Sequence, residues 1–413
     1  MGMRSNKTTR VEVINTGTEL LFGSILNRHL SYLGQQLFSL GFRIQRQSTV
    51  PDGDAIRDAI VEASSRCDLI LVTGGLGPTN DDITREIVAE LTDRPLYYNE
   101  AIFQNIKERL EKRGIRLTEH IARQAYVPKG ATVLPNDWGT APGLYLPAQG
   151  RFSHLFLFPG PPRELHPMFK NYATPILRTL AGDRDLHARV FLVAGLGESY
   201  VEDMVGKELE AIAGLEIGYC ARMGEVDLRI IGSRNVVEQG EQLIRVKLGP
   251  HIVTTNDKEL EEVVVELLTE KKATLAVAES CTGGLIANRI TDVPGASAVL
   301  LEGNVTYSNE AKTRILGVAE ELFTSVGAVS EEVAKAMAEG ARTHAGSTFA
   351  LSVTGIAGPD GGTEEKPVGT AYIGLASPDR PTEITKIFFP ADRKTFKRLC
   401  SQRALDMLRR RLI

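Results

Sequence analysis

The chain is poor in the features that mark secreted, metal-clustered and membrane proteins. Its 413 residues include only four cysteines, which are Cys67, Cys220, Cys281 and Cys400. They form no CxxC pair and no cluster with histidine, which excludes a disulfide scaffold and a structural zinc site. No apolar stretch approaches the roughly 20 residues that a membrane-spanning helix needs, and the polar start MGMRSNKTTR lacks a signal-peptide core. We expect a cytoplasmic protein that contacts no membrane.

The chain also lacks an excess of charge of either sign. It has 48 Lys and Arg against 52 Asp and Glu, a formal charge of −4. The only long basic block is the terminal LRRRLI. This segment is typical of a helix C-terminus, where cations are favourable. Sequence-independent nucleic-acid binding needs many lysines and arginines along one surface. We therefore expect small molecules as partners and no direct contact with nucleic acid.

The length of the chain predicts two or three domains, since one domain usually holds about 100 to 200 residues. Apolar residues make up 42% of the chain, and 39 of the 413 residues are glycine. This is an ordinary composition for an α/β protein. The hydrophobic patterns place three domains at 1–173, 174–254 and 255–413.

The first domain alternates strand and helix patterns, as in VEVINT, then ILNRHLSYLGQQLFSLG, then FRIQRQSTV. This order predicts a parallel sheet covered by helices, with ligands at the carboxyl ends of the strands. Those ends read NTGTE, TVPDGD and TGGLGPTNDD. Two later stretches, GTAPG and LFPGPPREL, are too rich in proline and glycine for a helix or a central strand, so we predict loops there.

The second domain has an order of three strands and two helices that is KH-like. The GXXG loop with which KH domains clamp nucleic acid is absent, so a spacer or a dimerisation module is the better interpretation. The third domain reads as an α/β/α sandwich that ends in an amphipathic helix.

In the third domain AESCTGG, residues 278–284, lies where a strand turns into a helix. Ser280 is there either a nucleophile or a helix N-cap, and Cys281 is the competing nucleophile. A serine needs a base, and the one histidine of this domain, His344, has the pattern of a solvated helix end. A lysine of lowered pKa is the alternative, and Lys312 and Lys366 lie near strand ends.

The third domain resembles a known family along most of its length, in AESCTGG, EGNVTYSNEAKTRILGV and SVTGIAGPDGGTEEKPVGTAYIG. These stretches are similar to the CinA C-terminal domain family, amidohydrolases that convert nicotinamide mononucleotide (NMN) to nicotinic acid mononucleotide and ammonia. The resemblance implies Ser280 as nucleophile, Lys312 as base and Thr354 as support, with Tyr307 as a further site residue. It implies no cofactor for the amidase.

The loops around these residues predict contacts with the substrate. Backbone N–H groups of Cys281, Thr282, Gly283 and Gly284 would bind the developing oxyanion. A phosphate would approach the backbone of a second loop and take its countercharge from the start of the last helix. The residues of these two segments are Gly355, Gly358, Gly361, Gly362, Arg393 and Lys394.

In the first domain TGGLGPTNDDIT, residues 73–84, resembles the loop of molybdopterin-binding proteins. Together with INTGTELLFGSILN and LFPGPPREL it is similar to the CinA N-terminal domain. Asn80 and Asp81 stand where molybdopterin-binding proteins tend to have basic residues. The resemblance implies a divalent metal, assisted by potassium, that cleaves ADP-ribose to AMP and ribose 5-phosphate.

The expected ligands of that metal, magnesium or another divalent ion, are carboxylates at strand ends. Asp52 and Asp82 match the acids of the family motif, while Asp81, Glu19 and Glu164 are weaker candidates. Asp81 and Asp82 are also explained as acids that open a helix. We expect the substrate phosphates near four further residues of these loops, which are Thr18, Gly74, Gly75 and Gly77.

The sequence thus predicts a bifunctional enzyme of pyridine-nucleotide salvage. Two alternatives stay open. Either only one domain is catalytic, with the first binding a nucleotide or a pterin, or the protein is a regulatory partner in competence or DNA damage. The family also implies a homodimer.

Overall fold

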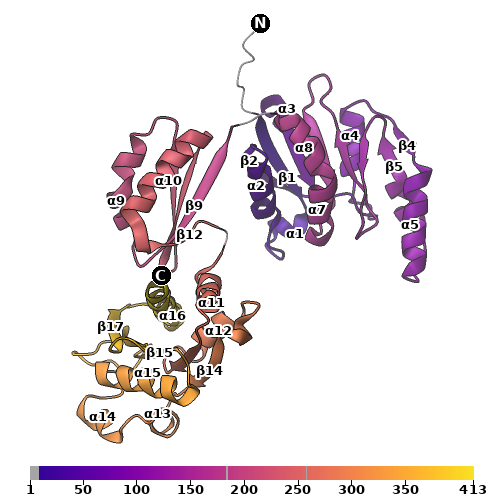
Figure 1. Ribbon diagram of the computed structural model, residues 1–413. Helices are drawn as coiled ribbons and strands as arrows, with labels where there is room; N and C mark the ends of the chain where they lie inside the picture. Colours follow the sequence, from indigo (N-terminus) through magenta and orange to yellow (C-terminus); the bar gives the residue numbers. More distant parts are fainter. Residues whose placement is uncertain (1–8, 183–184, 257) are drawn as a thin grey trace. The chain divides into compact units, whose positions relative to one another are not determined.

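A computed structural model describes residues 9–182, 185–256 and 258–413. The chain divides into two compact units, residues 1–185 and 186–413, and each is described by itself (Figure 1). The predicted mixed α/β architecture is confirmed.

Among the described residues of the first unit, the main sheet has six strands in the order β2-β1-β3-β8-β7-β6. They are β1 (Arg10–Thr16), β2 (Arg43–Val50), β3 (Leu69–Thr73), β6 (Thr132–Leu134), β7 (Gly143–Leu146) and β8 (His154–Phe158). The pairings from β2 to β8 are parallel, as predicted, whereas β7 and β6 extend the sheet in antiparallel order. The parallel part places four carboxyl strand ends along one edge.

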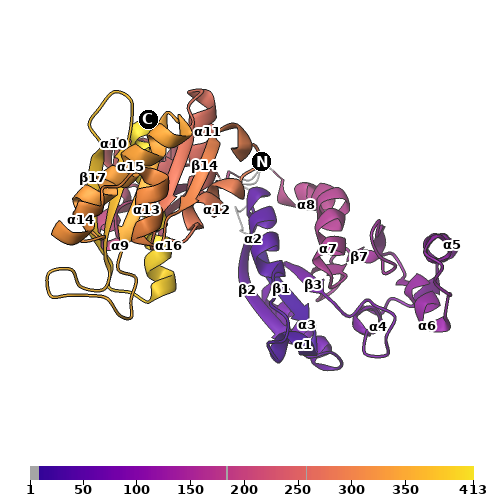
Figure 2. The same cartoon turned by 90° about the horizontal axis from the view of Figure 1, so that it is seen from below.

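Helices cover both faces of this sheet (Figure 2). On one face α2, α7 and α8 bury leucines such as Leu33, Leu165 and Leu177, and on the other α3 and α4 bury Ile60 and Val88. The elements of the unit outside the sheet are α1 (Thr18–Leu21), α2 (His29–Ser39), α3 (Ala55–Arg66), α4 (Thr84–Leu91), β4 (Leu96–Tyr98), α5 (Glu100–Lys112), α6 (Glu119–Ala122), η1 (Arg123–Ala125), β5 (Tyr126–Pro128), α7 (Pro162–Met168), the π-helical η2 (Phe169–Ala173) and α8 (Thr174–Ala181). Residues 174–181, which we assigned to the middle domain, thus pack in this unit.

The prediction of a loop at LFPGPPREL was wrong at both of its ends. Leu157 and Phe158 belong to the buried strand β8, and α7 begins at Pro162. Proline is tolerated in the first turn of a helix because its missing N–H has no partner there in any case. The loop is reduced to three residues, 159–161.

In the second unit the segment after residue 186 forms the predicted three-stranded, two-helix arrangement. Its described strands form a sheet in the order β10-β11-β9-β12, so one short strand adds to the three expected. The elements are β9 (His187–Ala194), α9 (Glu198–Glu210), β10 (Glu216–Arg222), β11 (Glu225–Gly232), α10 (Arg234–Leu248), η3 (Gly249–His251) and β12 (Ile252–Thr254). We call residues 186–254 the middle part.

The rest of the second unit, the C-terminal part, has a sheet whose described strands run β14-β13-β15-β16-β17. Its elements are α11 (Leu260–Glu270), β13 (Leu275–Glu279), α12 (Leu285–Thr291), η4 (Ala296–Ala298), β14 (Leu300–Val305), α13 (Asn309–Leu316), α14 (Glu320–Ser325), α15 (Glu331–Ala345), β15 (Phe349–Gly355), β16 (Thr370–Ala376), β17 (Glu383–Phe388) and α16 (Arg393–Leu412). The centre of the sheet shows the sandwich clearly. Val277 of β13 faces α11, α12 and α16, whereas Ala276 and Ala278 face α15.

The last helix, α16, is less amphipathic than the sequence predicted, because it is buried on most of its surface. It packs on the C-terminal sheet and also reaches the middle part. Arg409 donates hydrogen bonds to the carbonyl oxygens of Pro250 and Ile252, and Arg410 donates to that of Ala194. The helix therefore joins the two parts of the unit.

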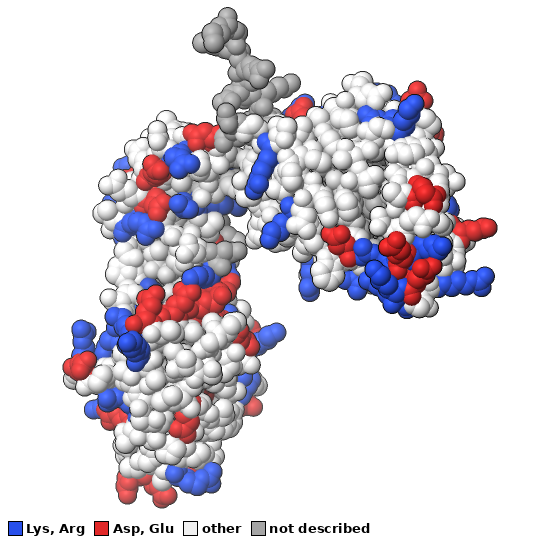
Figure 3. Space-filling model, turned by 45° about the vertical axis from the view of Figure 1, so that its right-hand side comes forward, with Lys and Arg blue, Asp and Glu red and all other residues white. Residues whose placement is uncertain are grey.

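Two surface properties bear on the expected partners. No helix among the described residues is both long and apolar enough to cross a membrane. On the face of the described residues shown in Figure 3, blue and red side chains are interspersed over both units, without one broad basic area.

Candidate functional site

Ser280 directly follows β13 and is held by the sheet. Its N–H donates to the carbonyl oxygen of Val353, and its own carbonyl accepts from the N–H of Gly283, which closes a tight turn. Gly283 and Gly284 have φ of 60° and 90°, the left-handed region that favours glycine. Helix α12 then begins at Leu285, with Gly284 as its N-cap. Ser280 is therefore not the helix cap that the sequence left open.

A buried carboxylate performs the capping instead. Glu279 is 1% exposed, and its two oxygens accept hydrogen bonds from the N–H groups of Ile286 and Ala287. These are amides of the first turn of α12, which have no partner within the helix. In the part of the chain that the structure describes, the N–H groups of Cys281 and Thr282 bond to no acceptor. Both remain available to an oxyanion beside Ser280.

Lys312 lies on α13, the helix that follows the neighbouring strand β14, and its side chain reaches Ser280. Its Nζ lies 3.2 Å from Oγ of Ser280, 2.9 Å from the carbonyl oxygen of Thr306 and 3.3 Å from that of Tyr307. These three neighbours are uncharged. The side chain is 1% exposed, and burial lowers the pKa of its ammonium group. A lysine in such a place is more easily neutral, which a general base requires.

Two threonines flank Ser280 on the adjacent strands. Glu279 pairs with Val305 on β14 and with Val353 on β15, so the next residues along, Thr306 and Thr354, lie on either side of Ser280. The hydroxyl of Thr354 donates to the carbonyl of Ala328 at 2.8 Å. The buried hydroxyls of Thr306 and Thr282 have no hydrogen-bond partner among the described residues. The site thus holds polar groups that protein atoms do not satisfy.

Tyr307 and Arg393 meet at the rim of this site. The Tyr307 side chain is exposed, and its hydroxyl accepts a hydrogen bond of 2.6 Å from Nη2 of Arg393. Nη1 of the same arginine donates to the carbonyl oxygen of Gly358 at 2.9 Å. One cation therefore connects the YSNEAK segment to the glycine-rich loop after β15.

The glycines of that loop are required by packing. A Cβ on Gly355 would lie 2.7 Å from Cβ of Ala371, and one on Gly358 would lie 2.6 Å from Cγ1 of Val368. A Cβ on Gly362 would lie 2.7 Å from the backbone N of Val368, and Gly361 has a φ of 91°. The approach of a phosphate to this backbone stays a prediction.

In the first unit the glycine loop folds against its own neighbours. A Cβ on Gly74 would lie 2.4 Å from Oγ1 of Thr16, and one on Gly75 would lie 2.0 Å from Oγ1 of Thr84. Thr84 opens α4 and bonds back to the loop through both its N–H and its hydroxyl. A Cβ on Gly77 would meet the carboxylate of Asp82 at 2.4 Å. These glycines therefore have a packing role, and their contact with phosphates stays a prediction.

The carboxylates expected to bind metal are occupied by local hydrogen bonds. Asp52 accepts from the N–H and hydroxyl of Thr18 at 3.0 and 3.1 Å. Asp82 accepts from the N–H of Thr79, whose hydroxyl also contacts Asp81 and lowers the pKa of that carboxyl group. Across the described ranges, no three His, Cys, Asp or Glu side chains are grouped to hold a metal ion.

Glu19 and Glu164 also lie apart from such a group. The Glu19 carboxylate lies over Gly17, where a Cβ would meet it at 2.7 Å. Glu164 is 8% exposed and accepts a hydrogen bond from Asn136. In these positions the carboxylates fit a magnesium ion only together with substrate phosphates, since magnesium binds through one or two carboxylates plus phosphate oxygens.

Comparisons with known proteins cover all three segments of the chain. Residues 12–179 match the probable molybdopterin binding domain, 188–248 the damage-inducible protein CinA KH domain, and 257–412 the CinA C-terminal domain. A CinA-like protein of Akkermansia muciniphila is 48% identical over 399 residues, covering 97% of this chain and 96% of its own. CinA-like proteins of Dictyoglomus turgidum and Kosmotoga olearia are each 42% identical over 412 residues, covering 98% of this chain and 99% of theirs.

The chain belongs to the CinA family. The resemblance predicted from the motifs is thereby confirmed, and so is the KH-like middle part, although its GXXG loop is absent.

Within this CinA chain, the side chains that compete with Ser280 and Lys312 for their roles have other partners. Lys366 donates to the carbonyl oxygen of Val326 at 2.6 Å. His344 is exposed at the end of α15, as predicted, and pairs with Glu302. Cys281 is 5% exposed and packs in the core with Cys400, whose pKa is raised by its contact with Cys281.

The sequence missed three groups of the CinA sites. One is Lys397 of α16, whose Nζ would lie 3.4 Å from a Cβ added to Gly283, so this cation lies beside the Ser280 turn. The predicted Lys394, by contrast, is an exposed residue one turn earlier in the same helix. Thr306 follows its strand as Ser280 follows β13, and the strand-end rule would have found it. In the first unit, Asn15 donates to Thr73 and accepts from Asn27 and Gln47.

Proposed function

We propose that the C-terminal part of this CinA protein hydrolyses the carboxamide of NMN to nicotinic acid mononucleotide and ammonia. The observation that carries the proposal is the 3.2 Å contact between Nζ of Lys312 and Oγ of Ser280 inside a buried pocket of carbonyl groups. The CinA C-terminal domain family is associated with amidohydrolase activity, which agrees with this chemistry.

In the proposed reaction the oxygen of Ser280 attacks the amide carbon while the neutral amine of Lys312 accepts the hydroxyl proton. The N–H groups of Cys281 and Thr282 bind the oxyanion that develops. Lys312 then gives its proton to the leaving nitrogen, so that ammonia departs and an acyl ester on Ser280 remains. Water, activated by the same amine, hydrolyses that ester.

The phosphate of NMN is assigned to the cations at the rim. Arg393 links Tyr307 to Gly358, and Lys397 lies beside the serine turn, so two positive charges belong to the segments around Ser280 and Lys312. Arginine and lysine are the usual partners of a phosphate group. Binding energy from this remote group would position the carboxamide for attack.

The test is ammonia release from NMN by the purified full chain, without added metal. Ser280→Ala should abolish release, and Cys281→Ala should retain most of it. Activity that survives Ser280→Ala and is lost in Cys281→Ala would refute the assignment of the nucleophile.

For the first unit we propose hydrolysis of ADP-ribose to AMP and ribose 5-phosphate with a divalent ion and potassium. Support comes from polar strand ends that meet at one edge of the sheet, where Asn15 donates a hydrogen bond to Thr73 and Asp52 accepts from Thr18. Asp52 and Asp82 would hold the ion, which would neutralise the charge of the pyrophosphate.

This second activity is tested with Ser280→Ala, in which the amidase is silent. AMP should form from ADP-ribose only when magnesium is added, and Asp52→Asn should prevent it. If the protein releases neither ammonia nor AMP but binds DNA in a salt-sensitive way, the regulatory alternative takes the place of both proposals.

A further inference from the structure

Arg289 is a buried cation near the end of α12, the short helix that follows the turn at residues 280–284. Its side chain is only 2% exposed, although arginine is almost never fully buried unless it is paired. The proposed reaction gives it no role. A buried charge is costly to desolvate, so the partners of Arg289 must explain its place.

The guanidinium group of Arg289 connects α12 to two other helices. It forms a bidentate pair with Glu261 of α11, from Nε to Oε1 at 3.1 Å and from Nη2 to Oε2 at 2.6 Å. It also donates to Oγ of Ser401 at 2.9 Å and to Oε1 of Gln402 at 2.7 Å, both on α16. Burial opposes the ionisation of Glu261, yet the hydrogen bonds from Arg289 hold the pKa of that carboxyl group below its ordinary value. The pair is therefore ionic, and its planar fork gives α12 a defined position against both neighbours.

Helix α16 also contacts the turn that carries Ser280. Cys400 packs with Cys281 in the core, and Nζ of Lys397 would lie 3.4 Å from a Cβ on Gly283. These contacts and the two acceptors of Arg289 come from one segment of α16, residues 397–402. Arg289 thus ties the helix that leaves the turn to the helix whose lysine is assigned to the phosphate of NMN.

The position of α12 needs such an anchor. The helix has only seven residues, and helices this short are not stable by themselves. Its N-cap, Gly284, has no side chain, and Glu279 at the end of β13 caps it instead. Ile286 and Ile290 pack in the core, but apolar contact is non-directional. The fork of Arg289 supplies the directional contact at the other end of the helix.

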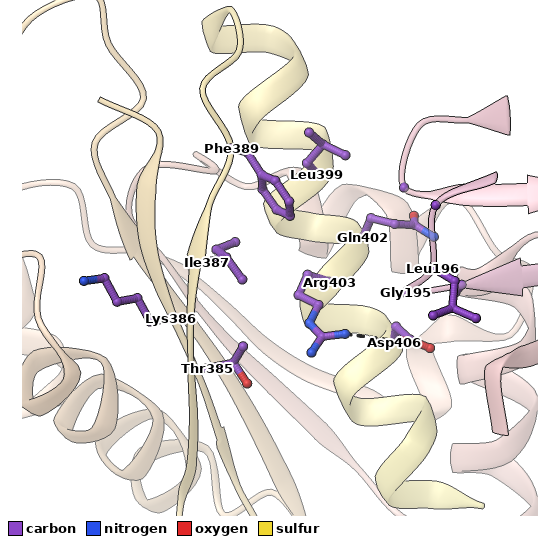
Figure 4. Close-up of a pocket in the computed structure, with 13 residues that line it drawn as sticks. Gly195, Leu196, Thr385, Lys386, Ile387, Phe389, Leu399, Gln402, Arg403 and Asp406 are labelled. Carbon is purple, nitrogen blue, oxygen red and sulfur yellow. Dashed lines mark ion pairs between the residues drawn. The ribbon is translucent and has the colours of Figure 1, made fainter. Parts of the chain in front are cut away.

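The acceptors of Arg289 are themselves held in place. Glu261 belongs to the first turn of α11. Gln402 projects from α16 toward the middle part, beside a cavity of about 440 Å³ (Figure 4). A Cβ on Gly224, in the turn between β10 and β11, would lie 2.9 Å from Cγ of Gln402. The network around Arg289 is therefore packed between α11, α16 and the middle part.

We propose that Arg289 is a positioning residue of the amidase, an inference that rests on the proposed hydrolysis of NMN. By fixing α12, Arg289 places the N–H groups of Cys281 and Thr282 where the oxyanion forms. A displacement of about 1 Å can cost on the order of 10²-fold in rate, even when the mutated residue lies away from the reacting atoms. The ion pair with Glu261 then serves position more than stability, because apolar residues in place of a buried pair are often neutral or stabilising.

The test removes first the cation and then the whole pair from the full chain. Arg289→Met should lower kcat for NMN about ten-fold or more and change KM less than about three-fold, because the phosphate cations stay on α16. The double variant Arg289→Met, Glu261→Met should regain the wild-type free energy of unfolding in urea without regaining kcat. Arg289→Lys keeps the charge but not the fork, so its kcat should be intermediate. If kcat returns together with stability in the double variant, Arg289 is only structural and the proposal is wrong.

Arg409 is the matched control, because it is equally buried and paired but holds another part of the structure. It is 1% exposed, donates to Asp406 at 2.7 Å and binds carbonyl oxygens of the middle part. Arg409→Met should lower the free energy of unfolding and leave the kcat of the folded protein unchanged. An equal loss of kcat in the Arg289 and Arg409 variants would overturn the specific role of Arg289.

Hydrogen exchange separates this inference from the proposed function. In the double variant the amides of Ile286 and Ala287, which donate to Glu279, should exchange faster, while those of β13 stay protected. Wild-type protein that releases no ammonia from NMN refutes the proposed function, whatever the exchange shows. Unchanged exchange and kcat in the double variant, when the wild type does release ammonia, overturn the positioning role alone.

Discussion

Nζ of Lys312 lies 3.2 Å from Oγ of Ser280, and its other two polar neighbours are the carbonyl oxygens of Thr306 and Tyr307. Carbonyl oxygens only accept, so two N–H groups of the lysine are directed to them. A neutral amine then has its lone pair left for the serine hydroxyl, which can donate to it. The arrangement therefore suits an amine that receives a proton from Ser280.

Replacing Lys312 with methionine should lower kcat for NMN by about 10²- to 10⁴-fold, the range typical of a general base. Lys312→Arg should not restore activity, because a guanidinium stays protonated. Lys366→Met is the matched control, since that lysine contacts Val326 instead, and it should keep most of its activity. Near-normal kcat in Lys312→Met would rule out the lysine as base.

The pH dependence of the wild-type amidase follows from the lowered pKa of Lys312. The base works when it is neutral, so kcat/KM should rise with pH as the ammonium loses its proton. Because burial lowers this pKa, the midpoint of the rise should lie below the ordinary lysine value of 10.5. A pH–rate profile from pH 6 to 10 measures it. A rate that falls over this range would contradict the proposed proton transfer.

Lys397 and Lys394 offer a matched pair for the phosphate contact. Lys397→Gln should raise KM for NMN about ten-fold or more, because its Nζ lies beside the turn at Gly283. Lys394→Gln removes the same charge from an exposed position of the same helix and should change KM little. The measurement is steady-state ammonia release, with nicotinamide riboside as a substrate without phosphate. If the two variants raise KM equally, Lys397 has no specific role.

Much of this fold could be predicted because strand patterns and loop glycines are local signals. The carboxyl ends of parallel strands meet at one edge, so AESCTGG and SVTG could be placed together from their strand patterns. What could not be predicted depends on tertiary contacts. Glu279 looks like an ordinary acid beside a serine, and only the fold directs both its oxygens to the amides of α12. Lys397 reaches Gly283 from the last helix, far along the chain.

The candidate metal ligands show where one sequence pattern allows two interpretations. Acids at the ends of strands predict a bound cation, and in this structure Asp52 accepts a hydrogen bond from Thr18 and Asp82 accepts one from Thr79. Turn-forming acids and metal ligands have the same sequence pattern, so the metal stays a prediction that magnesium-dependent release of AMP tests.

Gly75→Ala should destabilise the first unit by about 1 to 3 kcal/mol. The added Cβ would lie 2.0 Å from Oγ1 of Thr84, and the φ of 67° is unfavourable for alanine. Trp138 is the one tryptophan of the chain and lies in this unit, so its fluorescence reports the unfolding transition. Gly160→Ala is the control, because its Cβ would be 3.8 Å from Cα of Gly74. The kcat for NMN should be unchanged in both variants, and equal stability of the two would contradict the packing role of Gly75.

Glu225, at the border of the middle and C-terminal parts, should make the second unit less stable at alkaline pH. Burial raises its pKa from 4.5 to about 7. Between these values the folded state binds more protons than the unfolded state, so the free energy of unfolding decreases as pH rises through this window. The loss is complete above the folded pKa and is on the order of 3 kcal/mol.

Glu225→Gln removes this dependence, because glutamine stays neutral. The variant should match the wild type at pH 5 and be more stable at pH 8 by about 1 to 3 kcal/mol. Urea unfolding followed by far-UV circular dichroism measures this, and the transition that Trp138 fluorescence does not follow belongs to the second unit. Glu210→Gln, an exposed acid at the end of α9, controls for the loss of charge and should show no such gain. If Glu225→Gln is no more stable than the wild type at pH 8, the carboxyl group of Glu225 is ionised without penalty at neutral pH, and the prediction is wrong.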